Sequence, residues 1–245
     1  MTDSQPVSVQ RQQELERYLR PKPSDLAAYL ELAEIYRKQN RPVEARRTLT
    51  KALEVHPDEP QVVWQLEEAS LAASMQQLQQ VAELAQRLGT PEAQRELERS
   101  QTDWACRRVD VCKARLERDP GNVGLRIVSA ESLKELGRFD EALREAEAAT
   151  ENIQHAPAAH LIRGQCFQAT NKLAEALVAY RAAALRKACP ASPKIRVAAM
   201  RAAVELATTL GFTQTKKLYL HHLQLAETAL AAESKSPTPD PARGI

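Results

Sequence analysis

The sequence is poor in aromatic residues and glycine, and it lacks long apolar runs. Aromatic residues make up 4% of the 245 residues, and there are seven glycines. Strands favour aromatic and β-branched side chains, whereas Ala, Leu, Glu, Gln and Arg, which are abundant here, favour helices. No stretch approaches the roughly 18 consecutive apolar residues that cross a bilayer, and residues 1–10 lack the basic start and apolar run of a secretory signal. The composition therefore predicts an all-α protein without a membrane span.

The motifs of common active sites are also absent. The sequence contains neither GxGxxG nor GxxxxGK[ST], the glycine-rich loops that hold phosphates, and no GxSxG elbow for a serine nucleophile. Its five histidines include the adjacent pair His221 and His222, whose side chains would point about 100° apart on a helix and could not chelate one metal together. We therefore expect no catalytic residues, no cofactor, no metal site and no small-molecule substrate.

Cysteine usage is consistent with a protein of a reducing compartment. The four cysteines are far apart or six residues apart, without CxxC spacing. Reduced, partly buried thiols are the simplest interpretation, which predicts a cytoplasmic protein. The cysteines are Cys106, Cys112, Cys166 and Cys189.

Residues 26–190 read as short amphipathic helices separated by turns that contain Pro, Gly, Asn or Asp. The pairs Thr90-Pro91 and Ser192-Pro193 each place a hydroxyl N-cap before a proline in the first turn. Gly89, Gly137 and Gly211 each follow an apolar helical run, where we expect a left-handed residue to end the helix.

A period of 34 residues relates three segments, 26–59, 123–156 and 157–190. Each begins with a helix that carries a small residue at the same position, namely Ala33, Ala130 or Gly164. Each continues with a second helix that carries two alanines seven residues apart, as do Ala45 and Ala52 in the first segment. Small residues at fixed positions allow two helices to cross closely, and larger neighbours pack against the next pair.

This pattern resembles the tetratricopeptide repeat (TPR). The resemblance implies an all-α, right-handed α-α superhelix, a TPR solenoid of about five to six antiparallel helix pairs. We expect residues 1–25 to form an N-terminal arm and capping helix, and residues 26–232 to form the solenoid. Within it, 60–122 and 191–232 would be degenerate repeats, and 233–245, with three prolines, would be a disordered tail.

The stretch 60–122 is shorter than whole repeats would require. We expect it to hold about two more repeats, with one helix around Trp64, Leu66 and Leu71, and a second helix from Met75 to Leu88. Residues 91–118 are compatible with either two helices or one long helix.

In TPR proteins the first helix of each pair lines a concave groove that binds a peptide or helix of a partner protein. Carried onto this sequence, the resemblance implies a mixed surface with an apolar centre, which we call the groove face. Its members are Leu30, Glu34, Arg37 and Lys38 in the first repeat, Ile127, Glu131 and Lys134 in the second clear repeat, and Leu161, Gln165 and Gln168 in the third.

The groove face departs from the best-known TPR subfamily, which clamps the carboxylate of chaperone C-termini with Lys and Asn. Those two clamp positions fall on Leu30 and Glu34, and again on Ile127 and Glu131, so a carboxylate would meet repulsion. We predict no binding of chaperone tails. Leu30, Ile127 and Leu161 are instead candidates for an apolar anchor, with ordinary packing between helices as the alternative.

Charge is unevenly distributed, although the formal net charge is only +2. Between residues 176 and 226 there are eight basic residues and a single acid, Glu205. We call the basic set the basic face: Arg181, Arg186, Lys187, Lys194, Arg196, Arg201, Lys216 and Lys217. It would suit an acidic peptide, RNA or an anionic membrane, or it is a solvated surface that offsets acidic neighbours.

Three functions remain open from the sequence. The first is a non-catalytic scaffold or adaptor that binds a partner protein or peptide in the groove. The second is a regulator that uses the basic face on nucleic acid or anionic lipid, although only Tyr180, Phe212 and Tyr219 are available for base stacking. The third is an accessory subunit of an enzyme complex. Exposed apolar groove residues would also allow a homo-oligomer.

Overall fold

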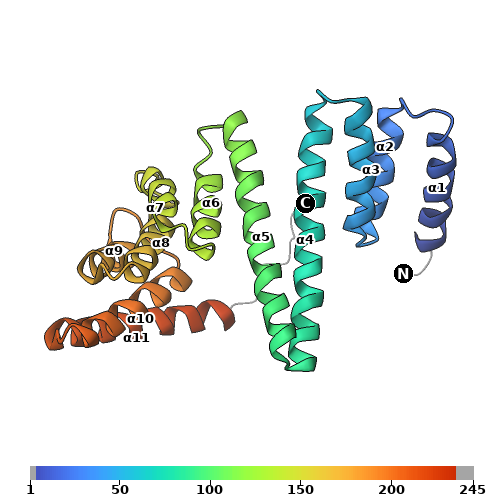
Figure 1. Cartoon of the computed structure of the whole chain (residues 1–245). Coiled ribbons are helices and arrows are strands. Elements are labelled where there is room, and N and C mark those ends of the chain that lie inside the picture. The colour runs from blue at the N-terminus through green and yellow to red at the C-terminus, as the bar shows by residue number, and fades with distance from the viewer. Residues whose placement is uncertain (1–3, 236–245) are drawn as a thin grey trace. The chain divides into compact units, whose positions relative to one another are not determined.

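The structure is a computed structural model that describes the backbone of residues 4–235 and the side chains of residues 9–233. These residues form eleven helices and no strand, which confirms the all-α fold (Figure 1). The helices are α1 (Ser4–Leu19), α2 (Leu26–Lys38), α3 (Pro42–Val55), α4 (Pro60–Leu88), α5 (Pro91–Arg118), α6 (Val123–Glu135), α7 (Phe139–Ala148), α8 (Ala156–Ala169), α9 (Leu173–Leu185), α10 (Pro193–Thr209) and α11 (Thr213–Lys235). Of the disordered tail predicted for 233–245, residues 233–235 are instead helical, at the end of α11, and residues 236–245 lie outside the described part of the chain.

Contacts between residues divide the chain into two compact units, Met1–Arg107 and Arg108–Ile245. The boundary lies inside α5, in the stretch that the sequence marks as degenerate.

In the first unit, α1 packs against α2, α2 against α3, and α3 against α4. Ala33, Ala45 and Ala52 have no exposed surface, so α2 and α3 cross closely at the predicted small residues. Leu49 fills the centre of the cluster, and Leu15 and Leu19 attach α1 to it. Burial of this apolar surface holds the unit together.

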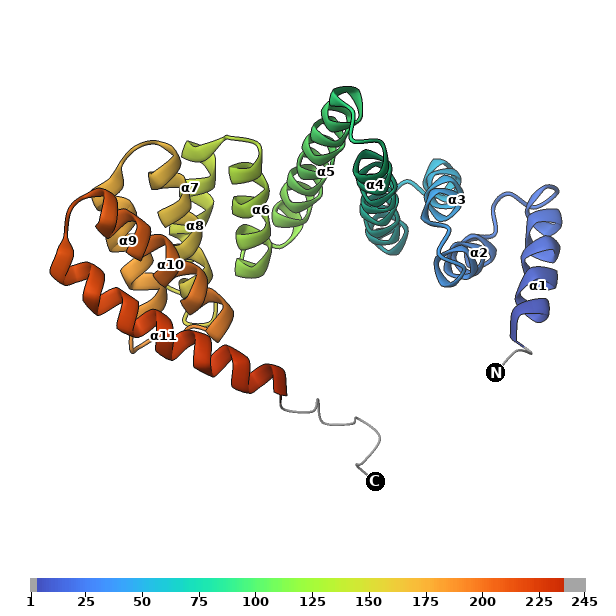
Figure 2. The same cartoon turned by 90° about the horizontal axis from the view of Figure 1, so that it is seen from below.

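In the second unit, α6 to α11 form three successive pairs, as Figure 2 shows from below. The first helices of these pairs, α6, α8 and α10, also contact one another in order. This adjacent packing is the arrangement of a helical solenoid. Two apolar clusters fill it, one around Leu133 and Ile162 and one around Tyr180 and Met200.

The turn inside each repeat contains a residue with positive φ at the same repeat position. It is Asn40 (55°) in the first repeat, Gly137 (73°) in the second and Asn171 (59°) in the third. Gly and Asn are the residues that adopt the left-handed conformation at least strain. The predicted helix ends at Gly89 (61°) and Gly211 (72°) are likewise confirmed.

The predicted layout of 60–122 is wrong in one respect. Residues 60–88 form the single helix α4 rather than two helices with a break before Met75, and residues 91–118 form the single helix α5. Two long helices therefore occupy the place of the two repeats that we expected. The physical reason is that residues 71–88 contain neither Pro nor Gly, so nothing interrupts the helix until Gly89.

Candidate functional site

In the second unit, the groove positions of successive repeats lie side by side. Lys134 of α6 donates a hydrogen bond from Nζ to Oε1 of Gln165 in α8, over 2.6 Å. Both side chains are half-buried. This hydrogen bond therefore connects the groove positions of α6 and α8.

The acidic member of this surface is already paired with a cation. Arg108 of α5 contacts Glu131 at 3.6 Å and Glu135 at 3.2 Å. Arg108 is mostly buried, whereas both carboxylates are about half exposed. Glu131 thus keeps some exposed surface, with its charge offset by a residue that lies outside the recognised repeats.

The apolar residues predicted for the centre of the groove are buried or partly buried in the structure. Ile127 is only 8% exposed and belongs to the apolar cluster of α6 to α8, so it is not available to a partner. Leu30 and Leu161 are half-buried and pack against the clusters of their own units. Packing between helices accounts for all three residues, because apolar side chains on adjoining helices bury one another before they can meet a partner.

Gln168 also has a structural role. It accepts a hydrogen bond of 2.7 Å from the hydroxyl of Tyr180, a buried residue of α9. Burial raises the pKa of Tyr180 to about 12, so the hydroxyl stays protonated and able to donate. Gly164 makes this arrangement possible, because a Cβ there would lie 2.5 Å from the Tyr180 ring.

In the first unit, the groove positions lie on α2. Glu34 pairs with Arg37 at 3.2 Å and with Lys38 at 3.7 Å, both within the helix. Arg37 and Lys38 remain exposed. This face is polar, and its charges are partly satisfied within the helix itself.

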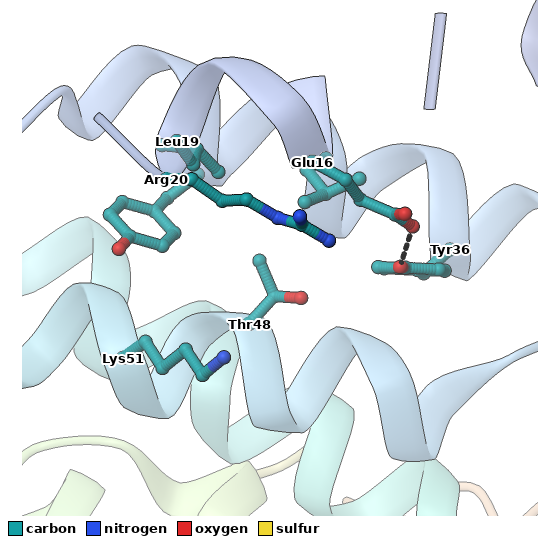
Figure 3. A pocket seen from close by; sticks show the side chains of 8 residues that line it. Glu16, Leu19, Arg20, Tyr36, Thr48 and Lys51 are labelled. Carbon is teal, nitrogen blue, oxygen red and sulfur yellow. Dashed lines mark hydrogen bonds between the residues drawn. The ribbon is translucent and has the colours of Figure 1, made fainter. Parts of the chain in front are cut away.

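A hollow of about 440 Å³ lies between α1, α2 and α3 (Figure 3). Tyr36 donates its hydroxyl to Oε1 of Glu16 over 2.6 Å on one side, and Arg20 and Lys51 line the hollow beside Thr48. The hydrogen bond from Tyr36 holds the pKa of Glu16 below its ordinary value. No sequence pattern predicts this hollow, because its residues come from three helices and the turn after α1.

The basic face divides into residues with different surroundings. Arg201 pairs with Glu227 at 2.8 Å. Arg186, Lys187 and Arg196 line a second hollow, of about 450 Å³, together with His222 of α11. Arg181, Lys194 and Lys217 are exposed, and Lys216 is half-buried.

Within the described residues, no three His, Cys, Asp or Glu side chains are placed to hold one metal ion. All four cysteines are free, and burial raises the pKa of the Cys166 thiol to about 11, so that thiol is unreactive. None of the helices in the described part of the chain is long and apolar enough to cross a membrane.

Two family models, both described as a tetratricopeptide repeat, match the chain. One matches residues 12–69 and the other residues 128–193. Together they cover about half of the chain, and the chain belongs to the tetratricopeptide-repeat family. Proteins of this family generally mediate protein-protein interactions. No curated protein matches the chain.

Solved structures show the same fold. MamA (residues 41 to the end) from Desulfovibrio magneticus RS-1 is 13% identical with a TM-score of 0.51, over 86% of this chain and 97% of the other. BtubC (BKLC) from P. vanneervenii is 14% identical with a TM-score of 0.51, over 98% of this chain and 94% of the other. At these identities the similarity defines the fold alone.

Proposed function

We propose that this protein is a non-catalytic scaffold or adaptor that binds a peptide or helix of a partner protein across the groove face of α6 and α8. The observation that carries the proposal is the hydrogen bond between Lys134 and Gln165. It joins the groove positions of two successive repeats into one surface, which is the surface that the family uses for partners. Free thiols support a reducing compartment, the cytoplasm, as its location.

The polar character of the groove indicates what the partner segment must offer. Lys134 and Gln165 are half-buried polar groups, Glu131 is half exposed beside Arg108, and the leucines and Ile127 pack into the core. Specificity here would come from hydrogen bonds and charge rather than from an apolar anchor. The segment should therefore carry polar side chains spaced to meet both helices.

The test compares two charge reversals in the same unit. Lys134→Glu changes the groove face, whereas Arg144→Glu makes the same change at an exposed position of α7, the second helix of the pair. A tagged chain is used to capture partners from the lysate of its source at two salt concentrations. The captured protein is then purified and titrated by calorimetry.

We expect wild type and Arg144→Glu to bind the same protein, and Lys134→Glu to bind it at least about tenfold more weakly. Light scattering of the chain alone distinguishes a second copy from a different partner. Equal binding by Lys134→Glu and Arg144→Glu, with both variants still helical, would remove the groove face as the site. Loss of a partner enzyme's activity on removal of this chain would instead identify an accessory subunit.

The regulator that binds nucleic acid or anionic lipid is less well supported. Tyr180 and Tyr219 are 1% and 4% exposed, so neither can stack on a base. Phe212 remains exposed. A steep loss of binding with salt, with RNA or anionic vesicles as the bound material, would favour this function over the scaffold.

A further inference from the structure

A second recognition site lies in the hollow that we call the α9–α11 hollow. We propose that it binds an acidic segment of the partner protein, whose carboxylates contact Arg186, Lys187 and Arg196. This inference rests on the proposed function and adds the charge and the docking point of the partner. The hollow has a volume of about 450 Å³, the size of a few side chains, and among the described residues that line it there is none of the groove residues of α6 and α8.

Three basic residues from two segments converge on this hollow. Arg186 and Lys187 follow the end of α9, Arg196 lies in the first part of α10, and His222 of α11 completes the polar lining. Among the described residues, none of those that line the hollow carries a carboxylate. The arrangement depends on the packing of three helices, so it is a shaped site and not a run of charge in the sequence.

Five arginines of the unit have acidic partners that the three cations of this hollow lack among the described residues. Arg108, Arg126, Arg138, Arg163 and Arg201 each pair with a glutamate. Within the described residues, by contrast, no carboxylate lies within ion-pair distance of Arg186, Lys187 or Arg196. The neighbour of Arg186 is the ring of His160, at 3.4 Å, and burial with nearby arginines lowers the pKa of that histidine. A carboxylate from outside would supply the missing charge.

The start of α10 adds to the positive potential. Ser192 caps the helix by accepting a hydrogen bond from the backbone N–H of Ile195, and the first turn contains no acidic residue. Helix N-termini are positive and usually have acidic neighbours, yet here Lys194 and Arg196 occupy the first part of the helix. Like charges are thus held together beside the positive end of a helix, an arrangement that an anion would relieve.

The shape and the walls favour a peptide over a nucleic acid or a membrane. Leu185, Pro190 and Ala191 form an apolar wall beside the cations, which suits an aliphatic side chain next to a carboxylate. Lipid headgroups would meet the exposed Arg186 and Lys187 but would leave the apolar wall without an aliphatic partner. The two tyrosines of the basic segment are buried, so a nucleic acid would find cations but few stacking surfaces.

The test uses a fluorescein-labelled peptide of five glutamates and one leucine, with a peptide in which lysine replaces glutamate as the negative probe. Binding is measured by fluorescence anisotropy with the full chain. The site variant is Arg186→Gln with Arg196→Gln. The control is Arg181→Gln with Lys217→Gln, which removes the same charge from exposed positions of the basic face outside the hollow.

We expect the acidic peptide to bind wild type and the control within about twofold of each other, and the site variant at least about tenfold more weakly. Ala191→Phe, which fills the hollow without changing its charge, should weaken binding similarly. Circular dichroism melting establishes that each variant is folded. An equal loss in the site variant and the control would show a diffuse charged surface and overturn the proposal.

Two further results would also overturn it, and each is distinguishable from failure of the groove. If binding of an RNA oligonucleotide or of phosphatidylserine vesicles requires Arg186 and Arg196 while the acidic peptide does not bind, the hollow does not bind an acidic segment of a protein. If the partner protein depends on Lys134 but not on Arg186 and Arg196, the scaffold function stands and this site does not. If binding of the peptide requires Arg186 and Arg196 but no partner protein requires Lys134, the proposal for the hollow stands and the proposal for the groove face does not.

Discussion

The repeat pair α8 and α9 and the long helix α4 are built on different principles. Seven of the 14 residues of α8 are buried, whereas only four of the 29 residues of α4 are. In α8, Gly164 lets Tyr180 lie directly against the helix backbone, while the buried residues of α4 are Val62 and three alanines. Close crossing at a small residue therefore stabilises the repeats, and local helix formation accounts for much of α4.

The same comparison explains why the prediction of two helices in 60–88 was wrong. The 34-residue period predicts a break between two helices in this stretch. The residues between Leu71 and Leu88 contain no helix breaker. A 34-residue repeat needs a left-handed residue in its turn, as Asn40, Gly137 and Asn171 show. The absence of such a residue near Met75 was the available signal for one continuous helix.

The largest difference between the regions should come from truncating a leucine. Leu133→Ala in α6 should lower the free energy of unfolding by about 2–5 kcal/mol, because the side chain is 2% exposed in a packed cluster. Leu88→Ala at the end of α4, where the side chain is 62% exposed, should change it by less than about 0.5 kcal/mol. Urea unfolding followed by circular dichroism measures both, and similar values would contradict the comparison.

Alanine should be the less stable residue at position 164 of α8, whereas glycine should be the less stable residue in α4. Gly164→Ala should destabilise by about 1–3 kcal/mol, because the new Cβ would meet the buried Tyr180 ring. At the exposed Ala72 of α4, the reverse change Ala72→Gly should destabilise by about 1 kcal/mol through helix propensity. Thermal melts decide the point. A gain in stability from Gly164→Ala would show that the crossing of α8 and α9 is looser than described.

The contact between repeats should show a smaller but measurable coupling. A double-mutant cycle of Lys134→Ala and Gln165→Ala should give about 1 kcal/mol, since the pair is half-buried and the donor is charged. The matched cycle on Glu92 and Arg95, an exposed pair 3.0 Å apart within α5, should give about 0.3 kcal/mol. Equal coupling in both cycles would mean that the repeats gain nothing from the groove-face hydrogen bond.

The smallest effect is the pH dependence that Glu16 of the first unit contributes. The hydroxyl of Tyr36 and the amide of Gln12 hold the pKa of Glu16 below its ordinary value of 4.5. A lowered pKa in the folded state gives stability that is present above pH 4.5 and is lost as the pH falls through the folded value. The urea concentration at the midpoint of unfolding should therefore decrease as the pH is lowered below 4.5. Tyr36→Phe should make this decrease smaller. An unchanged profile in Tyr36→Phe would exclude this hydrogen bond as the cause.

The sequence predicted which positions of the helices form the groove face, but it did not predict which of those side chains are exposed. The groove positions follow from the repeat period, and Lys134 and Gln165 do meet across α6 and α8. Ile127 occupies a groove position and is nevertheless buried, because Val109 of α5 and the helices α6 to α8 share one cluster. Arg108 was missed because it lies outside the recognised repeats, and His222 was missed because nothing in the sequence relates α11 to the end of α9.

The sequence by itself determined the helical class, the 34-residue repeats and the turns, because these depend on local propensity and on small residues at fixed spacing. Only the tertiary structure decided which groove residues are exposed, which glutamates are neutralised and which cations of the basic face share a hollow. Such properties depend on which side chains of separate helices fill the same space. The spacing of residues along one chain does not specify that.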